Sequence, residues 1–359
     1  NRLNKAELER FIKEGINSTR FLAEDKFRTL PDSSFYYKGG GVPLDLIDPS
    51  FDSINPDDKV GLAMKVCEEI YGKDKRIISS NGSYGDEKSF KYMVASNGFE
   101  GESANSSFTL VGNVSIKGEG DARPESYWYD SSIYYNELQK DGIGTKSIER
   151  VLQKLGQQKI ASGKYAMVVD NMNSSRLLSP VIGALYGSAI QQKNSFLLDK
   201  QDKLVLGSNV TIKDEPHLVK AEGARYFDNE GVATTPRAIF NEGVLNTYFI
   251  DTYNANKIQV KSTISSPSIL TMQHGMKDVN GLVASLGKGI LVTGFNGGNC
   301  NSTTGDFSYG IEGFHIENGK TTQPISEMNV TGNMITLWNN LSEAGNDIRK
   351  SSSWRIPSL

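Results

Sequence analysis

The sequence has no long apolar run. No segment approaches the roughly 18 consecutive apolar residues that a membrane-spanning helix requires. Hydrophobic side chains still make up 37% of the 359 residues, which is enough to form a buried core. The chain is therefore expected to be a soluble protein of one large or two smaller domains, with no membrane segment.

Cysteine and histidine are both scarce. The two cysteines, Cys67 and Cys300, lie far apart and give no disulfide framework, which favours a reducing, cytoplasmic location. The three histidines, His217, His274 and His315, are too widely spaced for one helix to present two of them to a metal ion. The sequence therefore predicts no metal or other cofactor on this chain.

An excess of charge of one sign is also missing. The chain has 39 basic and 42 acidic residues, a net charge of −3, and no basic block. Nucleic-acid binding usually leaves an electrostatic footprint that this balance does not show. The sequence also contains no P-loop, no G-x-S-x-G elbow and no dinucleotide fingerprint after a strand. These absences argue against nucleic-acid partners and against several common enzyme classes.

A starting methionine is absent, because the first residue is Asn1. The chain opens directly on an amphipathic helical pattern over residues 5–22. Its apolar residues recur on one face: Leu8, Phe11, Ile12 and Ile16. We therefore expect upstream sequence to be missing, and a targeting signal there stays an open alternative.

Residues 1–160 combine helices with strands, which predicts an α/β N-terminal part. Helical periodicity recurs over residues 56–71 and 145–155. Strands are expected over residues 76–80, 89–96, 106–117 and 125–132. Asn97–Gly98 between two of these strands predicts a hairpin turn.

Residues 161–359 consist mostly of strand patterns and turns, such as those at Glu242–Gly243 and Asn318–Gly319. Helical patterns are expected near residues 279–286 and 334–346 and in one central stretch. The whole chain is therefore expected to be α+β, with an α/β N-terminal part followed by a β-rich C-terminal domain from Ala161.

The central stretch, residues 173–199, follows an apolar strand pattern over residues 165–170. Its apolar residues recur on one helical face: Leu178, Val181, Ile182, Leu185, Ala189 and Ile190. Ser179–Pro180 fits a helix N-cap followed by proline at the first helical position. A cap at Ser174 or Ser175, with Pro180 inside the helix, is the alternative.

Small residues on this helix predict a close approach of another element. Gly183 and Gly187 are spaced one turn apart, and each is expected to pack against a neighbour. The helix is either a buried packing helix or the floor of a cleft.

Two polar stretches contain candidates for chemistry in a cleft. Asp228 and Glu230 share one short turn, where two carboxylates either act as acid and base or hold the turn. Residues 295–305 predict a flexible glycine-rich loop, in which Cys300 is either reactive or without a chemical role. His315 lies in a strand pattern, where a lone histidine is more often packed than catalytic.

Four stretches together resemble the TldD/PmbA family, also called the modulator-of-DNA-gyrase or TldE family. They lie over residues 177–198, 227–251, 281–295 and 301–334, in the family's order. The resemblance covers most of the chain from about residue 55 onward. It implies an α+β fold with a β-rich C-terminal half, and dimers that enclose a central chamber.

The resemblance also implies which branch of the family this chain joins. The catalytic, TldD-like branch holds zinc with a His-Glu-x-x-x-His helix that follows two leucines, and it cleaves unfolded peptides. Here Leu177–Leu178 is followed by SPVIGA, so Ser179 and Ala184 stand at the histidine positions and Pro180 at the glutamate position. Serine and alanine provide no imidazole, and proline cannot act as a base. The sequence therefore resembles the PmbA/TldE branch, whose members pair with a TldD-like protease and lack its metal site.

Three functions stay open at this point. The chain is either a non-catalytic subunit that holds unfolded peptides along sheet edges while a TldD-like partner carries zinc, or a stand-alone homodimeric peptide-binding protein. The third alternative is an independent hydrolase that uses Cys300 or a carboxylate pair. A homodimer is expected when the chain is isolated. The candidate cleft residues are Asp228, Glu230, Cys300 and His315.

Overall fold

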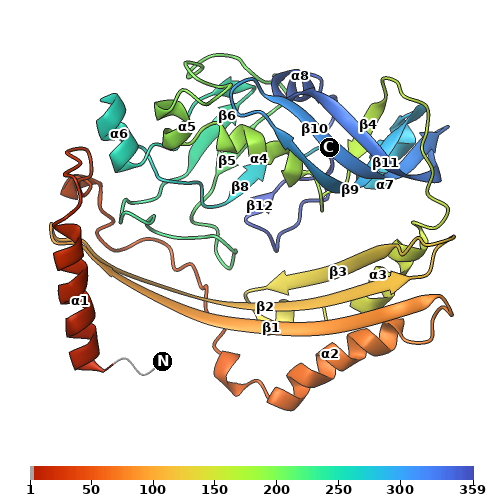
Figure 1. Cartoon of the computed structure of the whole chain (residues 1–359), viewed down its shortest axis with the longest axis horizontal. Coiled ribbons are helices and arrows are strands. Elements are labelled where there is room, and N and C mark those ends of the chain that lie inside the picture. The colour runs from red at the N-terminus through yellow and green to blue at the C-terminus, as the bar shows by residue number, and fades with distance from the viewer. Residues whose placement is uncertain (1–3) are drawn as a thin grey trace.

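The computed structural model describes residues 4–359 and confirms the mixed α+β class (Figure 1). A long, curved sheet from the first half of the chain runs along one side of the molecule, and two helices cover its outer face. The second half of the chain forms two further sheets on the other side of the long sheet. The division into domains between residues 160 and 161 stays a prediction.

The long sheet has three antiparallel strands in the order β1-β2-β3. Where the sequence predicted two short strands before the hairpin, the structure has one strand of 18 residues. The residues between the two predicted strands, NGSYGDEK, have low strand propensity, but pairing with β2 along their whole length orders them. The hairpin at Asn97–Gly98 is confirmed, and Gly98 has a φ of +98°. The bounds are β1 Ile77–Val94, β2 Glu100–Ile116 and β3 Glu125–Ser132.

Two helices pack on the outer face of the long sheet through glycines. Gly82 and Gly112 pair with each other across β1 and β2. A Cβ on Gly82 would lie 2.2 Å from the Ala63 carbonyl oxygen, and one on Gly112 would lie 2.8 Å from Ser147 Oγ. The helices therefore approach this closely only because both positions lack a side chain. Their bounds are α2 Pro56–Ile70 and α3 Ile143–Leu152, close to those predicted.

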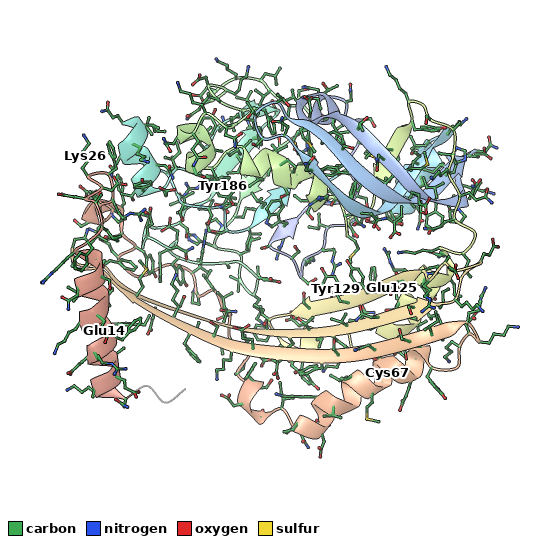
Figure 2. The ribbon with its side chains drawn as sticks, in the orientation of Figure 1. Glu14, Lys26, Cys67, Glu125, Tyr129 and Tyr186 are labelled. Atoms are coloured by element: carbon green, nitrogen blue, oxygen red, sulfur yellow. The ribbon has the colours of Figure 1, made fainter. Side chains whose placement is uncertain are left out.

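The inner face of the long sheet, which faces the second half of the chain, carries mostly small polar side chains. Side chains point alternately to the two faces of a strand. The residues of this face therefore alternate along each strand with the residues that contact the helices. On β3 the face continues with Glu125, Tyr127 and Tyr129, and the two tyrosine rings stack with centroids 6.2 Å apart. Figure 2 shows Glu125 and Tyr129 on this side and Cys67 of α2 on the other. The small polar residues include Ser79, Asn81, Ser83, Asn105, Ser107, Thr109, Asn113 and Ser115.

The tip of the β1–β2 hairpin is anchored to the second half of the chain. Phe99 is 2% exposed and packs against Tyr36 and Phe227, with ring centroids 4.9 and 5.2 Å away. The Tyr36 hydroxyl donates a hydrogen bond to Asn97 Oδ1 at 2.6 Å. Gly231 has a φ of +84°, and a Cβ there would lie 2.8 Å from the Phe99 ring. The contact therefore requires glycine at position 231.

The first helix, α1 (Lys5–Thr19), stands at the end of the long sheet where the hairpin tip lies (Figure 1). It ends at Thr19 rather than at residue 22 as predicted. The predicted apolar face exists, but it is not buried within the described chain: Phe11 is 74% exposed and Ile16 is 53% exposed.

The second half of the chain folds around one large apolar core between two sheets. The sheets have the orders β11-β10-β9-β4 and β12-β8-β5-β6-β7. The strand bounds are β4 Ala166–Val169, β5 Ile212–Asp214, β6 Arg237–Asn241, β7 Val244–Leu245, β8 Leu270–Met272, β9 Lys288–Cys300, β10 Asp306–Glu317, β11 Lys320–Asn333 and β12 Trp354–Arg355.

Short helices connect these strands. The helix predicted over residues 279–286 is confirmed as α7, whereas the one predicted over residues 334–346 ends early, at Asn339. Among residues 4–359, no helix has the length and apolar character needed to cross a membrane. The bounds are α4 Ser175–Gly183, α5 Gly187–Gln191, α6 Thr252–Ile258, α7 Val279–Ser285 and α8 Met334–Asn339, with 3₁₀ turns η1 Ser33–Phe35, η2 Phe51–Ser53 and η3 Tyr135–Glu137.

Candidate functional site

The central stretch forms two short helices rather than one long helix. Helix α4 begins after Ser174 and contains Pro180 in its interior, so the earlier start is confirmed and the cap at Ser179–Pro180 is wrong. The Ser174 side chain does not cap the helix but donates to the Ile356 carbonyl oxygen. An interior proline removes a backbone hydrogen bond and weakens a helix. Burial of the apolar face of α4 offsets this loss. The buried residues are Leu177, Leu178, Val181 and Ile182.

The two glycines of this stretch differ in their surroundings. A Cβ on Gly187 would lie 2.9 Å from Asn254 Cβ and 3.2 Å from Ile250 Cα, so α5 and α6 meet closely there. A Cβ on Gly183 would have no atom within 4 Å. The predicted close packing is therefore confirmed at Gly187 and wrong at Gly183.

The N-terminal half of α4 lines one wall of a cleft. Two cavities of about 530 and 850 Å³ adjoin, because Met172, Asn173 and Phe295 line both of them. We call the two cavities together the α4 cleft. The smaller one is bounded by α4, and the larger one extends to the inner face of the long sheet. This placement supports the hypothesis that the central stretch floors a cleft.

Two ion pairs join α3 and the turn that follows it to the second half of the chain. Lys154 Nζ lies 2.6 Å from Glu312 Oε1, and Arg150 Nη1 lies 3.9 Å from Asp170 Oδ2. Arg150 also donates to the Thr293 carbonyl oxygen at 3.4 Å. These four charged side chains are less than a quarter exposed, so solvent screens them less than surface pairs. They hold α3 against β9, β10 and the end of β4.

Asp170 organises the start of α4. Burial raises the pKa of the Asp170 carboxyl, whereas the Asn173 amide, 2.6 Å from Oδ1, and Arg150 act in the opposite direction. Asn173 also donates to the Thr293 carbonyl oxygen at 2.8 Å. The Asp170 carbonyl oxygen accepts the Ser174 N–H at 2.9 Å. Asp170 thereby fixes both a cleft-lining amide and the first turn of the helix.

The predicted carboxylate pair is not among the residues that line the α4 cleft. Asp228 Oδ1 accepts the backbone N–H groups of Glu230 and Val232 at 2.8 and 3.0 Å. The Glu230 carboxylate accepts the N–H and hydroxyl of Thr252 at 2.9 and 3.0 Å, and burial raises the pKa of Glu230. These contacts favour the turn-forming interpretation of both residues.

Cys300 and His315 also lie outside the set of lining residues. Cys300 ends β9 and pairs with Phe307, so the prediction of a flexible loop over residues 295–305 is wrong in its first half. Burial raises the pKa of the Cys300 thiol, and Asp306 acts in the same direction, so the reactive thiolate is disfavoured at neutral pH. His315 is 9% exposed and packs edge-on against a tyrosine ring, as the packed interpretation expects.

Two family models match this fold along the chain. The PmbA/TldA metallopeptidase central domain matches residues 49–155, and the PmbA/TldA metallopeptidase C-terminal domain matches residues 162–359. The chain belongs to the PmbA/TldA metallopeptidase family. This is the TldD/PmbA family that the sequence resembles, so the resemblance is confirmed.

Named relatives and solved structures agree with this assignment. Metalloprotease PmbA of Escherichia coli O157:H7 is 28% identical over 99% of this chain and 79% of its own length. The PmbA homolog of Haemophilus influenzae is 30% identical over 85% of this chain and 69% of its own length. A crystal structure from Bacteroides thetaiotaomicron, named for modulation of DNA gyrase, is 65% identical and has a TM-score of 0.98 over all of this chain and 82% of that one. TldE from Thermococcus kodakarensis has a TM-score of 0.83 at 16% identity over all of this chain and 84% of that one, which shows the fold alone.

The PmbA/TldA family name implies a metallopeptidase, but the residues that the resemblance aligns with the zinc motif do not fit a metal ion. Ser179 is exposed and lines the α4 cleft, Pro180 lies within α4, and Ala184 is 2% exposed in the core. Zinc sites in proteins use imidazole, thiolate or carboxylate ligands, none of which these residues provide. Across residues 4–359, no three His, Cys, Asp or Glu side chains are grouped so that they could hold a metal ion.

The charged residues of the α4 cleft were not predicted from the sequence. Arg150 comes from α3, Lys154 from the turn after it, Arg176 from α4 and Glu312 from β10, and no short motif links them. In the helix predicted over residues 145–155, the four-residue spacing of Arg150 and Lys154 would place both on one face, which could have indicated a cationic surface. Only the fold shows that both residues line the α4 cleft.

Proposed function

We propose that this chain is a non-catalytic, peptide-binding subunit that works with a TldD-like zinc peptidase. The observation that carries the proposal is that Ser179 lies on the wall of the α4 cleft. By the resemblance, Ser179 stands at a histidine position of the zinc motif of the catalytic branch. Zinc hydrolysis at that place needs imidazoles to hold the ion and a carboxylate to take a proton from water. Ser179, Pro180 and Ala184 provide neither, so a partner would have to supply them.

The proposed ligand is an unfolded peptide in an extended conformation. Strand β3 is an edge strand of the long sheet, and its residues Glu125–Tyr127 line the α4 cleft. An edge strand presents unpaired backbone N–H and C=O groups, to which an extended peptide can add as a further strand. The polar inner face of the long sheet provides further hydrogen-bonding groups beside this edge. This geometry suits peptides of many sequences.

The proposed partner is a protein that carries the His-Glu-x-x-x-His sequence. The TldE structure from Thermococcus kodakarensis shares the fold of this chain, and the family also contains relatives named TldD. The free thiols Cys67 and Cys300 favour the cytoplasm as the compartment of the proposed complex. A stand-alone homodimer that binds peptides is the alternative that uses the same cleft.

The test compares three samples on one unfolded peptide: this chain, the TldD-like partner and their mixture, each with and without a chelator. We expect cleavage by the mixture that the chelator abolishes, and no cleavage by this chain alone. Chelator-resistant cleavage by this chain alone, lost in Cys300→Ala, would overturn the proposal. Peptide binding without any complex with a His-Glu-x-x-x-His protein would favour the stand-alone homodimer.

A further inference from the structure

The α4 cleft contains more positive than negative charge. The pairs Lys154–Glu312 and Arg150–Asp170 each join one cation to one carboxylate, so they add no net charge to the cleft wall. Glu125 is a further lining carboxylate, and Arg123 and Arg176 are further lining guanidinium groups.

The other guanidinium groups in or near the α4 cleft have no carboxylate partner within residues 4–359. No ion pair joins Arg123, Arg176 or Arg349 to an acidic side chain. Arg349 contacts the sulfur of Met172, which lines both cavities, and its guanidinium lies 4.4 Å from the centroid of the Tyr129 ring. Two unpaired guanidinium groups, those of Arg123 and Arg176, therefore line the cleft, against one unpaired lining carboxylate, that of Glu125.

Arg176 is held in place while most of its donors stay free. Its guanidinium lies 4.8 Å from the centroid of the Tyr309 ring, and one nitrogen donates to the Gly298 carbonyl oxygen at 3.2 Å. Tyr309 is 2% exposed, so the ring that supports Arg176 is fixed in the core. A guanidinium has five N–H donors, and the Gly298 contact accounts for one. Arg176 and Ser179 are three residues apart in α4 and both line the smaller cavity.

We infer that the α4 cleft selects peptides that carry a free carboxylate, and that Arg176 binds this carboxylate through its guanidinium group. The inference rests on the proposed peptide-binding function. The carboxylate is either an acidic side chain or the C-terminus of the peptide, because both present two oxygens in one plane to the two parallel N–H bonds of an arginine. The inner face of the long sheet is mostly uncharged, so it holds the rest of the peptide without charge selection.

The test measures the affinity of the full chain for four labelled peptides of one sequence by fluorescence anisotropy. The peptides combine a single Glu or Gln with a C-terminal acid or amide, which separates the two sources of the carboxylate. We expect the peptides with a carboxylate to bind about tenfold more tightly than the neutral Gln amide, since hydrogen bonds to charged groups contribute on this scale. The preference should shrink as salt is added.

Matched variants assign the effect to Arg176. Arg176→Gln should abolish the preference for peptides with a carboxylate, and urea unfolding of the variant beside the parent checks that it is folded. Arg28→Gln is the control, because Arg28 also lies over a tyrosine ring, Tyr253, at 4.7 Å, and is not among the residues lining the cleft. Arg28→Gln should keep the preference for peptides with a carboxylate.

The outcomes separate the inference from the function on which it rests. Equal binding of all four peptides to the unmodified chain would overturn the inference and leave the peptide-binding function in place. A preference that survives in Arg176→Gln would overturn the role of Arg176. Failure of all four peptides to bind would overturn the proposed function itself.

Discussion

Single side chains in this protein matter most where they meet a close neighbour. Gly187 and Gly183 are one turn apart in sequence, yet only Gly187 lies against another element. Gly187→Leu should therefore lower the free energy of unfolding by about 1–3 kcal/mol, because its side chain would overpack against Asn254 and Ile250. Gly183→Leu is the matched control and should not destabilise, since its Cβ meets open space. Urea unfolding checks both, and equal stability of the two variants would contradict the packing.

At the same scale, the buried Asp170 makes stability depend on pH. Its pKa is raised above the ordinary value of 3.8 that it has in the unfolded chain. The folded state therefore binds more protons between the two pKa values, so this contribution to stability is present at low pH and is lost as pH rises through the folded pKa.

Asp170→Asn removes this titration. The free energy of unfolding of the variant, relative to the parent, should rise with pH from roughly pH 4 upward, whereas Asp214 and Glu230 titrate in both proteins and cancel. Urea unfolding at a series of pH values measures the difference. A difference that is constant with pH would show that Asp170 has its ordinary pKa in the folded chain.

At the scale of elements, the β1–β2 hairpin depends on its anchored tip. Phe99→Ala should cost about 3–5 kcal/mol, because it empties the contact with Tyr36 and Phe227. Phe90→Ala on the same hairpin is the control: Phe90 is 71% exposed, and its loss should change stability by about 0.5 kcal/mol or less. Thermal and urea unfolding of the two variants compare them. Similar losses in both would mean that the tip is not anchored as described.

Elements with a clear period of apolar residues, or with a clear turn sequence, were predicted well from the sequence. Strand β3 has the predicted bounds, and the turn at Asn97–Gly98 is where the sequence places it. Strand β1 was predicted in two pieces, because its Asn, Gly and Ser residues favour strands only when a partner pairs with them. The cap at Ser179–Pro180 was wrong because burial of the apolar face outweighs the local preference of proline.

The α4 cleft was predicted only in part, because the fold brings its residues together from distant parts of the chain. Ser179 was placed by the resemblance, and it does line the cleft. Arg150, Lys154 and Glu312 come from elements far apart in the chain, so no spacing relates them. The predicted cleft residues Asp228 and Glu230 instead hold a turn, because carboxylates serve both purposes and only their hydrogen bonds distinguish them.

At the scale of the whole molecule, the isolated chain exposes large apolar side chains. One face of α1 presents four of them, all more than 40% exposed: Leu8, Phe11, Ile12 and Ile16. Exposed apolar surface of this kind marks interaction sites in soluble proteins. We predict that the isolated chain is a homodimer that buries more than about 1,600 Å² in total, the size of a standard specific interface. Light scattering at working concentration measures the mass, and a monomer would contradict the prediction.

The long sheet is attached to the second half of the chain at both of its ends. Phe99 anchors the hairpin tip, and the Lys154–Glu312 and Arg150–Asp170 pairs attach α3 at the other end. A sheet that is attached at both ends cannot rotate as a rigid body about either end. The distance between the sheet and α4 is therefore set by the fold. If the cleft binds peptides as proposed, the peptide would therefore have to fit a space of fixed spacing, because the sheet cannot close onto it.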